Sequence, residues 1–269
     1  MKVLSKIFTA LVFLFLYAPL IIMVIFSFNS GKSTSVFMGF STKWYQSMFS
    51  SSQTVTALQN TLILALCSAA IATVLGTLAA VGIYNMRSKA VKSAAMTVTN
   101  IPMMNPDIVT GVSLMLLFVF IGRMIGARES LSFFTILIAH ITFNLPYVIL
   151  NVLPKLRQTS GSLTEAALDL GCTPVKAFFK VVLPNISSGI FSGFLMSFTL
   201  SLDDFVISYY TNGADFQTLP LMIYSMTKKK VKPDMYAISS LIFFSVLILL
   251  IAINLFQMHS EKSKAKKEQ

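Results

Sequence analysis

Three carboxylates lie inside long apolar stretches, where acidic side chains are costly. They are Asp107, Asp203 and Asp204, and the whole chain has only ten acidic residues. An ionised carboxylate at the centre of a bilayer costs about 2.5–3.5 kcal/mol on insertion scales, so it requires a partner or a water-filled path. No lysine or arginine lies within the same stretches. A passing organic cation could supply the missing charge, so these carboxylates are candidates for a substrate path.

Each of these carboxylates also has a structural interpretation. Asn105-Pro106-Asp107 fits a helix start, with Asn105 as the cap and Asp107 at the positive helix end, and this role is compatible with a path. Asp203 and Asp204 are adjacent, so on a helix they point about 100° apart. We expect one of them to line the path and the other to meet a neighbouring helix or subunit. Neither would cap a helix unless the helix breaks there.

The other reactive side chains are isolated. Cys67 lies in an apolar run and Cys172 in a polar loop, which argues against a disulfide framework or a metal site. His140 and His259 are far apart in sequence, and we expect each to be a satisfied or exposed histidine. The sequence therefore predicts no catalytic residue, no metal ligand and no cofactor.

The elements that must position the carboxylates are membrane spans. The 269 residues are 55% hydrophobic and 12% charged, and apolar runs of about 20 residues, long enough to cross a bilayer, recur six times. The pattern predicts an all-α integral membrane protein with one domain, 1–269. The predicted spans are residues 7–28, 61–86, 96–121, 131–153, 186–210 and 235–257.

Several of these spans have features of their own. Pro102 and Pro106 should kink or break the third span. The fifth span is predicted as one helix, in which Asp203 lies roughly 26 Å from Ile186 at about 1.5 Å per residue. That length places the aspartate pair toward the outer half of the membrane, with Asp107 nearer the middle. After the sixth span, residues 258–269 are rich in lysine and are predicted to be disordered.

Small side chains mark one face of the second span. Ala72, Gly76 and Ala79 share that face at helical spacing. Small residues permit close helix contact in a bilayer. Packing within the chain and contact with a partner subunit both fit this pattern.

A polar segment, residues 154–185, separates the fourth and fifth spans. Its sequence predicts two short helices that meet at a turn. Thr164 fits the cap of the first helix and Gly171 its end, while Thr173-Pro174 fits the start of the second. We expect Pro184 to end the element before the membrane resumes. A soluble binding partner would explain so long a polar interruption.

Within this segment, the spacing of Glu165-Ala166-Ala167, Gly171 and Leu183-Pro184 resembles the EAA loop of ABC-importer permeases. The resemblance implies a six-span type I ABC importer permease fold in which the loop docks into a groove on a cytoplasmic ATPase. It makes the chain a transport subunit and not an enzyme. The implied coupling residues are Glu165, Ala166, Ala167, Gly171, Leu183 and Pro184. ATP must bind to the ATPase, because Gly31-Lys32-Ser33 only mimics a phosphate-binding loop and Phe26 replaces its first glycine.

Three further stretches, Met103–Val109, Ser197–Asp204 and Leu219–Met226, resemble PotC-type permeases of spermidine/putrescine importers. The resemblance extends over nearly the whole chain. It implies inward transport of spermidine or putrescine by alternating access, with Asp107, Asp203 and Asp204 along the path. The implied partners are two copies of a cytoplasmic ABC ATPase, a second PotB-type permease and an extracytoplasmic polyamine-binding protein.

The distribution of basic residues predicts the orientation. Across the six predicted spans, 13 of the 21 lysines and arginines fall on one side. That side should be cytoplasmic, because cytoplasmic loops carry an excess of positive charge. It holds both termini and the EAA loop, as contact with an ATPase requires. The implied location is the bacterial cytoplasmic (inner) membrane, and short basic loops account for the net charge of +11 without nucleic acid.

Other classes of transporter remain as alternatives. Within the importers, the cargo could be putrescine alone, another small cation or a metal complex. A secondary transporter would show inverted repeats with broken helices in matching positions, and the sequence gives the proline-broken third span no clear counterpart. A channel would need a repeated filter segment, which the sequence lacks.

Overall fold

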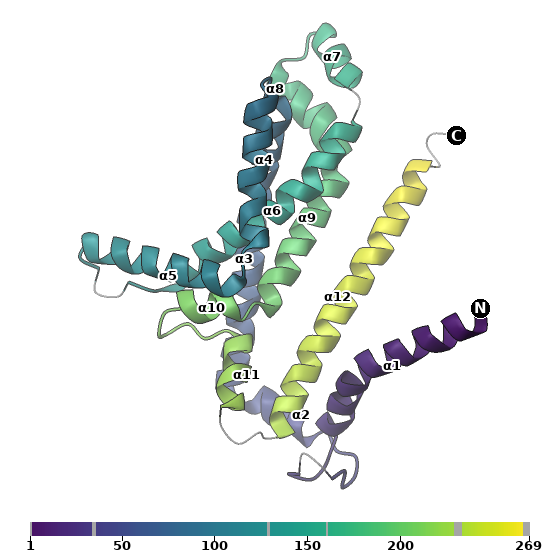
Figure 1. Ribbon diagram of the computed structural model, residues 1–269, viewed down its shortest axis with the longest axis vertical. Coiled ribbons are helices and arrows are strands. Elements are labelled where there is room, and N and C mark those ends of the chain that lie inside the picture. The colour runs from purple at the N-terminus through teal and green to yellow at the C-terminus, as the bar shows by residue number, and fades with distance from the viewer. Residues whose placement is uncertain (1, 34–35, 128–129, 160, 229–232, 266–269) are drawn as a thin grey trace. The chain divides into compact units, whose positions relative to one another are not determined.

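The computed structural model describes residues 2–33, 36–127, 130–159, 161–228 and 233–265, and helices dominate them (Figure 1). Within these residues, five helices are long and apolar enough to cross a membrane, and Asp234–Ile248 is a shorter apolar helix. The prediction of an all-α membrane protein is therefore confirmed. The five long segments are Leu4–Ser27, Ser52–Asn85, Asp107–Met124, Phe133–Gln158 and Pro174–Asp203.

The chain forms two compact units, which comprise residues 1–58 with 219–251 and residues 59–218 with 252–269. The first unit contains α1 (Lys2–Ser27), α2 (Lys43–Ser50), the start of α3 (Ser52–Asn85), α11 (Leu219–Thr227) and most of α12 (Pro233–Ala265). Its core is a cluster of apolar side chains from α2, α3, α11 and α12, namely Met48, Ala57, Leu219, Met222 and Ile238.

A buried asparagine organises the loop after α1. The side chain of Asn29 donates to the carbonyls of Ser33 and Val36, and its Oδ1 accepts from the N–H groups of Gly31 and Met38. One side chain thus satisfies several backbone groups of the loop, and an antiparallel bridge between Asn29 and Phe40 closes it. The loop leads directly into α2.

The second unit contains the rest of α3 and the helices that carry the candidate site residues. These are α4 (Lys89–Met104), α5 (Asp107–Met124), α6 (Phe133–Gln158), α7 (Gly161–Asp169), α8 (Pro174–Ala177), the π-helix η1 (Phe178–Val182), α9 (Leu183–Asp203) and α10 (Val206–Thr211). Figure 1 shows α6 and α9 side by side, and α5 against α10.

Glycines bring α6 and α9 into close contact. A Cβ atom at Gly189 would lie 2.8 Å from the carbonyl oxygen of Asn151, and one at Gly193 would lie 3.2 Å from Cα of Val148. The two glycines are one turn apart on α9, which is the spacing that lets helix backbones approach in a bilayer.

The small-residue face of α3 packs within the chain. Ala72 is fully buried, and a Cβ atom at Gly76 would lie 2.6 Å from Cβ of Val148 on α6. This face could pack within the chain or contact a partner subunit, and the structure supports packing within the chain for Ala72 and Gly76.

The third predicted span is broken, as its prolines indicated. Helix α4 ends at Met104 and α5 begins at Asp107, with Asn105 extended between them. Pro102 remains inside α4, so the break occurs at Pro106. The predicted cap was wrong, because Asn105 ends α4 and Pro106 occupies the cap position of α5 without a side-chain hydrogen bond.

The fifth predicted span differs more from its prediction. It was expected as one helix over 186–210, but α9 ends at Asp203 and α10 begins at Val206. The sequence did not predict this break. The side chain of Asp204 makes the break possible, because it supplies hydrogen-bond acceptors to the new helix start.

The C-terminal tail also differs from its prediction over part of its length. Helix α12 continues to Ala265, so residues 258–265 are helical and not disordered, while residues 266–269 lie outside the described part of the chain. Lysine, glutamate and alanine are favourable helix formers, which explains why a helix can continue beyond the apolar stretch.

The contact between α6 and α9 gives a test of the fold. Gly189→Ala should destabilise the protein by about 1–3 kcal/mol, because the new methyl group meets the backbone of α6 and forces the helices apart. Thermal unfolding of the purified protein in detergent would measure this loss. Gly82→Ala is the matched control on α3, since a Cβ atom there meets nothing within 4 Å. Equal stability of the two variants would contradict the close packing.

Candidate functional site

The break between α9 and α10 is built around Asp204. The residue has extended backbone angles (φ −61°, ψ 124°) between the two helices. Its carboxylate accepts hydrogen bonds from the backbone N–H groups of Ile207 (3.3 Å) and Ser208 (2.8 Å). The first N–H groups of a helix have no partner within the helix. Asp204 therefore caps α10. The sequence predicted a continuous helix here, in which Asp204 would have no capping role.

His140 of α6 contacts both sides of this break. Its Nε2 atom lies 3.4 Å from Oδ2 of Asp204 and 3.0 Å from Oγ of Ser208, and its Nδ1 atom lies 3.1 Å from Oγ of Ser201 on α9. The side chains of His140 and Asp204 are only 1% and 7% exposed. The prediction of a satisfied histidine is confirmed, but its contact with Asp204 was not predicted.

Ser201 extends these contacts into a polar network. Nδ2 of Asn144 donates to Oγ of Ser201 at 2.7 Å, and Oγ of Ser68 lies 2.9 Å from the same atom. The network thus joins α3, α6, α9 and α10. Buried polar groups need such partners where water is scarce. Oδ1 of Asn144 is an exception, because it is buried without a hydrogen-bond partner among the described residues.

A sequence signal for this network existed but was weak. His140 and Asn144 lie four apart in an apolar span, which places them on one helix face. Ser201, Asp204 and Ser208 follow a similar spacing. Polar residues spaced this way in two spans predict two polar faces, but their pairing depends on which helices become neighbours.

Ser201, His140 and Asp204 are the residue types of a nucleophilic triad, but Ser201 is not accessible to a substrate. Serine, histidine and aspartate in mutual contact act in many hydrolases, where the serine oxygen attacks a bound carbonyl. Ser201 is only 2% exposed, and its oxygen already accepts a hydrogen bond from Asn144. Burial keeps substrates away from this oxygen, so the geometry favours a structural network over nucleophilic catalysis.

Asp107 and Asp203 both lie on the exposed surface of the second unit. Helix α5 packs on α10, where a Cβ atom at Gly111 would lie 3.1 Å from the ring of Tyr210 and 3.5 Å from the carbonyl oxygen of Val206. Asp107 precedes Gly111 by about one helical turn of α5. Asp203 ends α9 immediately before the break that leads into α10.

The turn in the EAA loop forms largely as predicted. Gly171 has φ +82°. Its N–H donates to the carbonyl of Leu168, and the N–H of Cys172 donates to the carbonyl of Ala167. This pair of bonds is a Schellman motif, in which glycine ends a helix without strain. Thr173 then caps α8 and accepts a hydrogen bond from the N–H of Lys176, as its sequence indicated.

Two predicted boundaries in this loop were wrong. Helix α7 begins at Gly161, so Thr164 lies inside it and does not cap it. Pro184 does not end the second element, since α8, η1 and α9 follow one another without interruption. The N–H of Leu183 bonds to the carbonyl of Phe178, five residues back. This wider π turn precedes Pro184 and accommodates a residue that cannot donate to the ordinary helical pattern.

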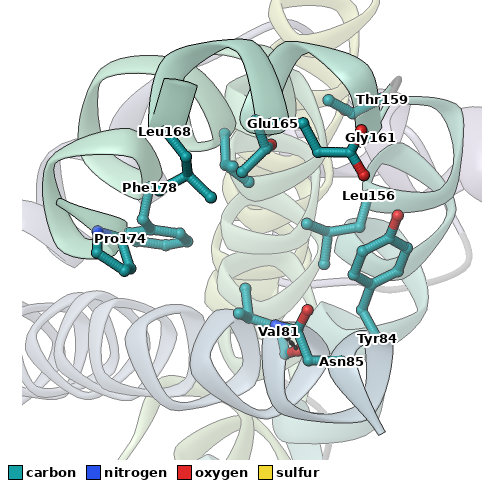
Figure 2. A pocket seen from close by; sticks show the side chains of 12 residues that line it. Val81, Tyr84, Asn85, Leu156, Thr159, Gly161, Glu165, Leu168, Pro174 and Phe178 are labelled. Carbon is teal, nitrogen blue, oxygen red and sulfur yellow. Dashed lines mark hydrogen bonds between the residues drawn. The ribbon is translucent and has the colours of Figure 1, made fainter. Parts of the chain in front are cut away.

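A cavity of about 370 Å³ lies between the EAA loop and the ends of the spans. Figure 2 shows Val81, Tyr84 and Asn85 of α3 on one side of the cavity, across from Glu165 and Leu168 of α7. Glu165 and Ala166 are exposed, whereas Ala167 is buried and Leu183 and Pro184 lie in the first turn of α9. The loop therefore presents an exposed outer surface while an open space lies beneath it.

The conformation of Gly171 can be tested directly. Gly171→Val should destabilise the turn by about 1–2 kcal/mol, because a side chain is unfavourable in the left-handed region. Amide hydrogen exchange of residues 167–172 should accelerate accordingly. Gly161→Ala is the control, since its Cβ atom meets nothing within 4 Å and its φ is not positive. Unchanged exchange in the Gly171 variant would contradict the described turn.

Comparison with known proteins identifies relatives of the chain. Residues 72–266 match the family described as "Binding-protein-dependent transport system inner membrane component". The chain is 41% identical to the putrescine transport system permease protein PotI of Escherichia coli K12 over 235 residues, which cover 87% of this chain and 83% of PotI. It is 36% identical to the spermidine/putrescine transport system permease protein PotC of the same strain over 248 residues, which cover 92% and 91% of the two chains.

Solved structures support the fold. The chain superposes on a bacterial ABC transporter involved in the import of alginate with a TM-score of 0.73 and 16% identity, over 97% of this chain and 95% of the other. It superposes on the MetNI methionine ABC transporter with a TM-score of 0.62 and 17% identity, over 76% and 94%. Together with the matched family, these similarities confirm the predicted ABC importer permease fold. The chain belongs to the family of binding-protein-dependent transport system inner membrane components.

Proposed function

We propose that this chain is a permease subunit of an ATP-driven importer that carries spermidine or putrescine inward. The exposed carboxylates Asp107, which begins α5, and Asp203, which ends α9 at the break before α10, are the observation that carries the proposal. A polyamine carries several positive charges, and carboxylates can replace part of the hydration that it loses in a pore. The names of PotI and PotC support this cargo over a metal complex or another small cation.

The two adjacent aspartates have different roles in this proposal. Asp203 is exposed and meets the cargo, whereas Asp204 is buried against His140 and caps α10. Asp204 therefore affects the path indirectly, because it stabilises the break between α9 and α10. This division agrees with the expectation that only one of the pair lines the path.

The partners follow from the family and from the exposed loop. Two copies of a cytoplasmic ABC ATPase hydrolyse ATP, a second PotB-type permease completes the path, and an extracytoplasmic polyamine-binding protein delivers the cargo. A crystal structure of the related alginate transporter includes a bound periplasmic protein, which supports the last of these partners. The chain lies in the bacterial cytoplasmic (inner) membrane with both termini and the EAA loop on the cytoplasmic side.

Transport proceeds by alternating access. The ATPase grips the exposed surface of α7, which contains Glu165 and Ala166, and its closure moves the loop with respect to the spans. Because α8, η1 and α9 are continuous, movement of the loop reaches the helix that ends at Asp203. A ligand shifts such an equilibrium only by its difference in affinity for the two states, so the path must bind the cation more tightly when open outward than when open inward.

Replacing the exposed carboxylates tests the cargo path. Asp203→Asn and Asp107→Asn should each lower ATP-dependent uptake of labelled spermidine by at least tenfold, since hydrogen bonds to charged groups are worth about 1.5–3 kcal/mol and about 1.4 kcal/mol corresponds to a tenfold change. Uptake into proteoliposomes that contain the complete transporter would measure this loss. Asp215→Asn is the matched control, because Asp215 is also exposed but follows α10 in a loop. Full uptake by both path variants would refute the carboxylate path.

A second experiment tests the coupling surface. Glu165→Ala should lower transport-coupled ATP hydrolysis by about tenfold, which corresponds to about 1.4 kcal/mol of lost contact energy. Arg87→Ala is the control, since Arg87 is an exposed charge in the loop between α3 and α4. Hydrolysis should be measured per assembled complex. An equal effect of the two substitutions would argue against a specific role for α7.

A further inference from the structure

We propose that His140 is a positioning residue for the substrate path, which it controls by fixing the break between α9 and α10. This inference rests on the proposed function, because it names the residue that fixes the helix break beside Asp203. The imidazole ring contacts Ser201 in the last turn of α9 with one nitrogen, and Asp204 and Ser208 with the other. One rigid ring thus bridges the two helical segments that flank Asp203.

The hydrogen-bond pattern assigns a different task to each nitrogen. Nε2 lies within hydrogen-bond distance of Oγ of Ser208 (3.0 Å), and Oδ2 of Asp204 lies slightly farther away, at 3.4 Å. Asp204 accepts hydrogen bonds from the N–H groups of Ile207 and Ser208, and Nε2 of His140 lies beside the same carboxylate. Nδ1 faces Ser201, which is also held by Asn144 and Ser68. Ser201 keeps two other contacts without His140, whereas Asp204 would lose its link to α6.

The consequence for Asp203 follows from its place in the chain. It lies between Ser201 and Asp204, which His140 contacts together. Without the Nε2 contact, Asp204 would remain a cap of α10, but α10 could change its angle relative to α9. Asp203 ends α9 directly beside the break, so a change in the angle of α10 would alter the surroundings of its exposed carboxylate, and the path would bind a cation less well.

Asparagine and glutamine separate this role from general packing. The side-chain amide of asparagine can take the position of Nδ1, and the longer glutamine can place its amide near the position of Nε2. Both residues are polar and similar in size, so a histidine that only fills a polar site should tolerate them about equally. The positioning role requires the Nε2 contact, so only glutamine should replace His140.

The experiment compares these two variants in the complete transporter. His140→Gln should retain uptake of labelled spermidine within about threefold of the unchanged protein, and His140→Asn should lower it by about tenfold, the loss that corresponds to about 1.4 kcal/mol. Rates are expressed per assembled complex, so reduced folding does not count as reduced transport. Equal uptake by the two variants, or higher uptake by His140→Asn, would overturn the proposal.

A second measurement does not depend on the cargo. Spin labels at Met196→Cys on α9 and Tyr209→Cys on α10, both exposed positions, report the distance across the break in a chain whose Cys67 and Cys172 are replaced by serine. The distance distribution should be narrow with His140 or His140→Gln and broader with His140→Asn. An unchanged distribution in His140→Asn would overturn the positioning role. If the unchanged transporter takes up no spermidine, the proposed cargo fails, while this distance still decides the role of His140.

Discussion

The second unit depends on one constraint: a helix that breaks where its backbone is buried must satisfy the groups that the break leaves open. At Asp204 the solution is a carboxylate that accepts from two backbone N–H groups and is held in turn by His140. Unsatisfied polar groups in the hydrocarbon region cost several kcal/mol each, so these contacts are a condition for the break to exist. The neighbouring helices supply the partners.

The break explains how the proposed charged path is compatible with a stable membrane protein. A single continuous fifth span would place two adjacent carboxylates on a helix with no built-in partner. The observed geometry buries Asp204 as a cap and leaves Asp203 on the surface. Only one charge then requires compensation from water or from a passing cation. The second break, before Asp107, places another carboxylate at a helix start, where the helix dipole favours it.

The other end of α9 shows how force can travel through the same element. The EAA loop is separated from the end of α3 by a cavity, but it continues without interruption through η1 into α9. Close packing around the whole loop would resist its movement. The continuous helix that runs from α8 through α9 can transmit movement of the loop along the helix axis. The π turn before Pro184 lies between the loop and the span, and such turns often occur at functional sites. The proposed path and the proposed coupling surface therefore share one structural element.

Local physics determined much of this protein from sequence. Apolar runs predicted the spans, Pro106 predicted the break before α5, and Gly171 with Thr173-Pro174 predicted the turn of the EAA loop, because each depends on residues close in the chain. The spacing of the EAA residues indicated the permease fold before any comparison. The break at Asp204 and the role of His140 could not be predicted in this way. Both depend on α6 lying against α9 and α10, and only the tertiary structure brings a histidine in one span to a carboxylate in another.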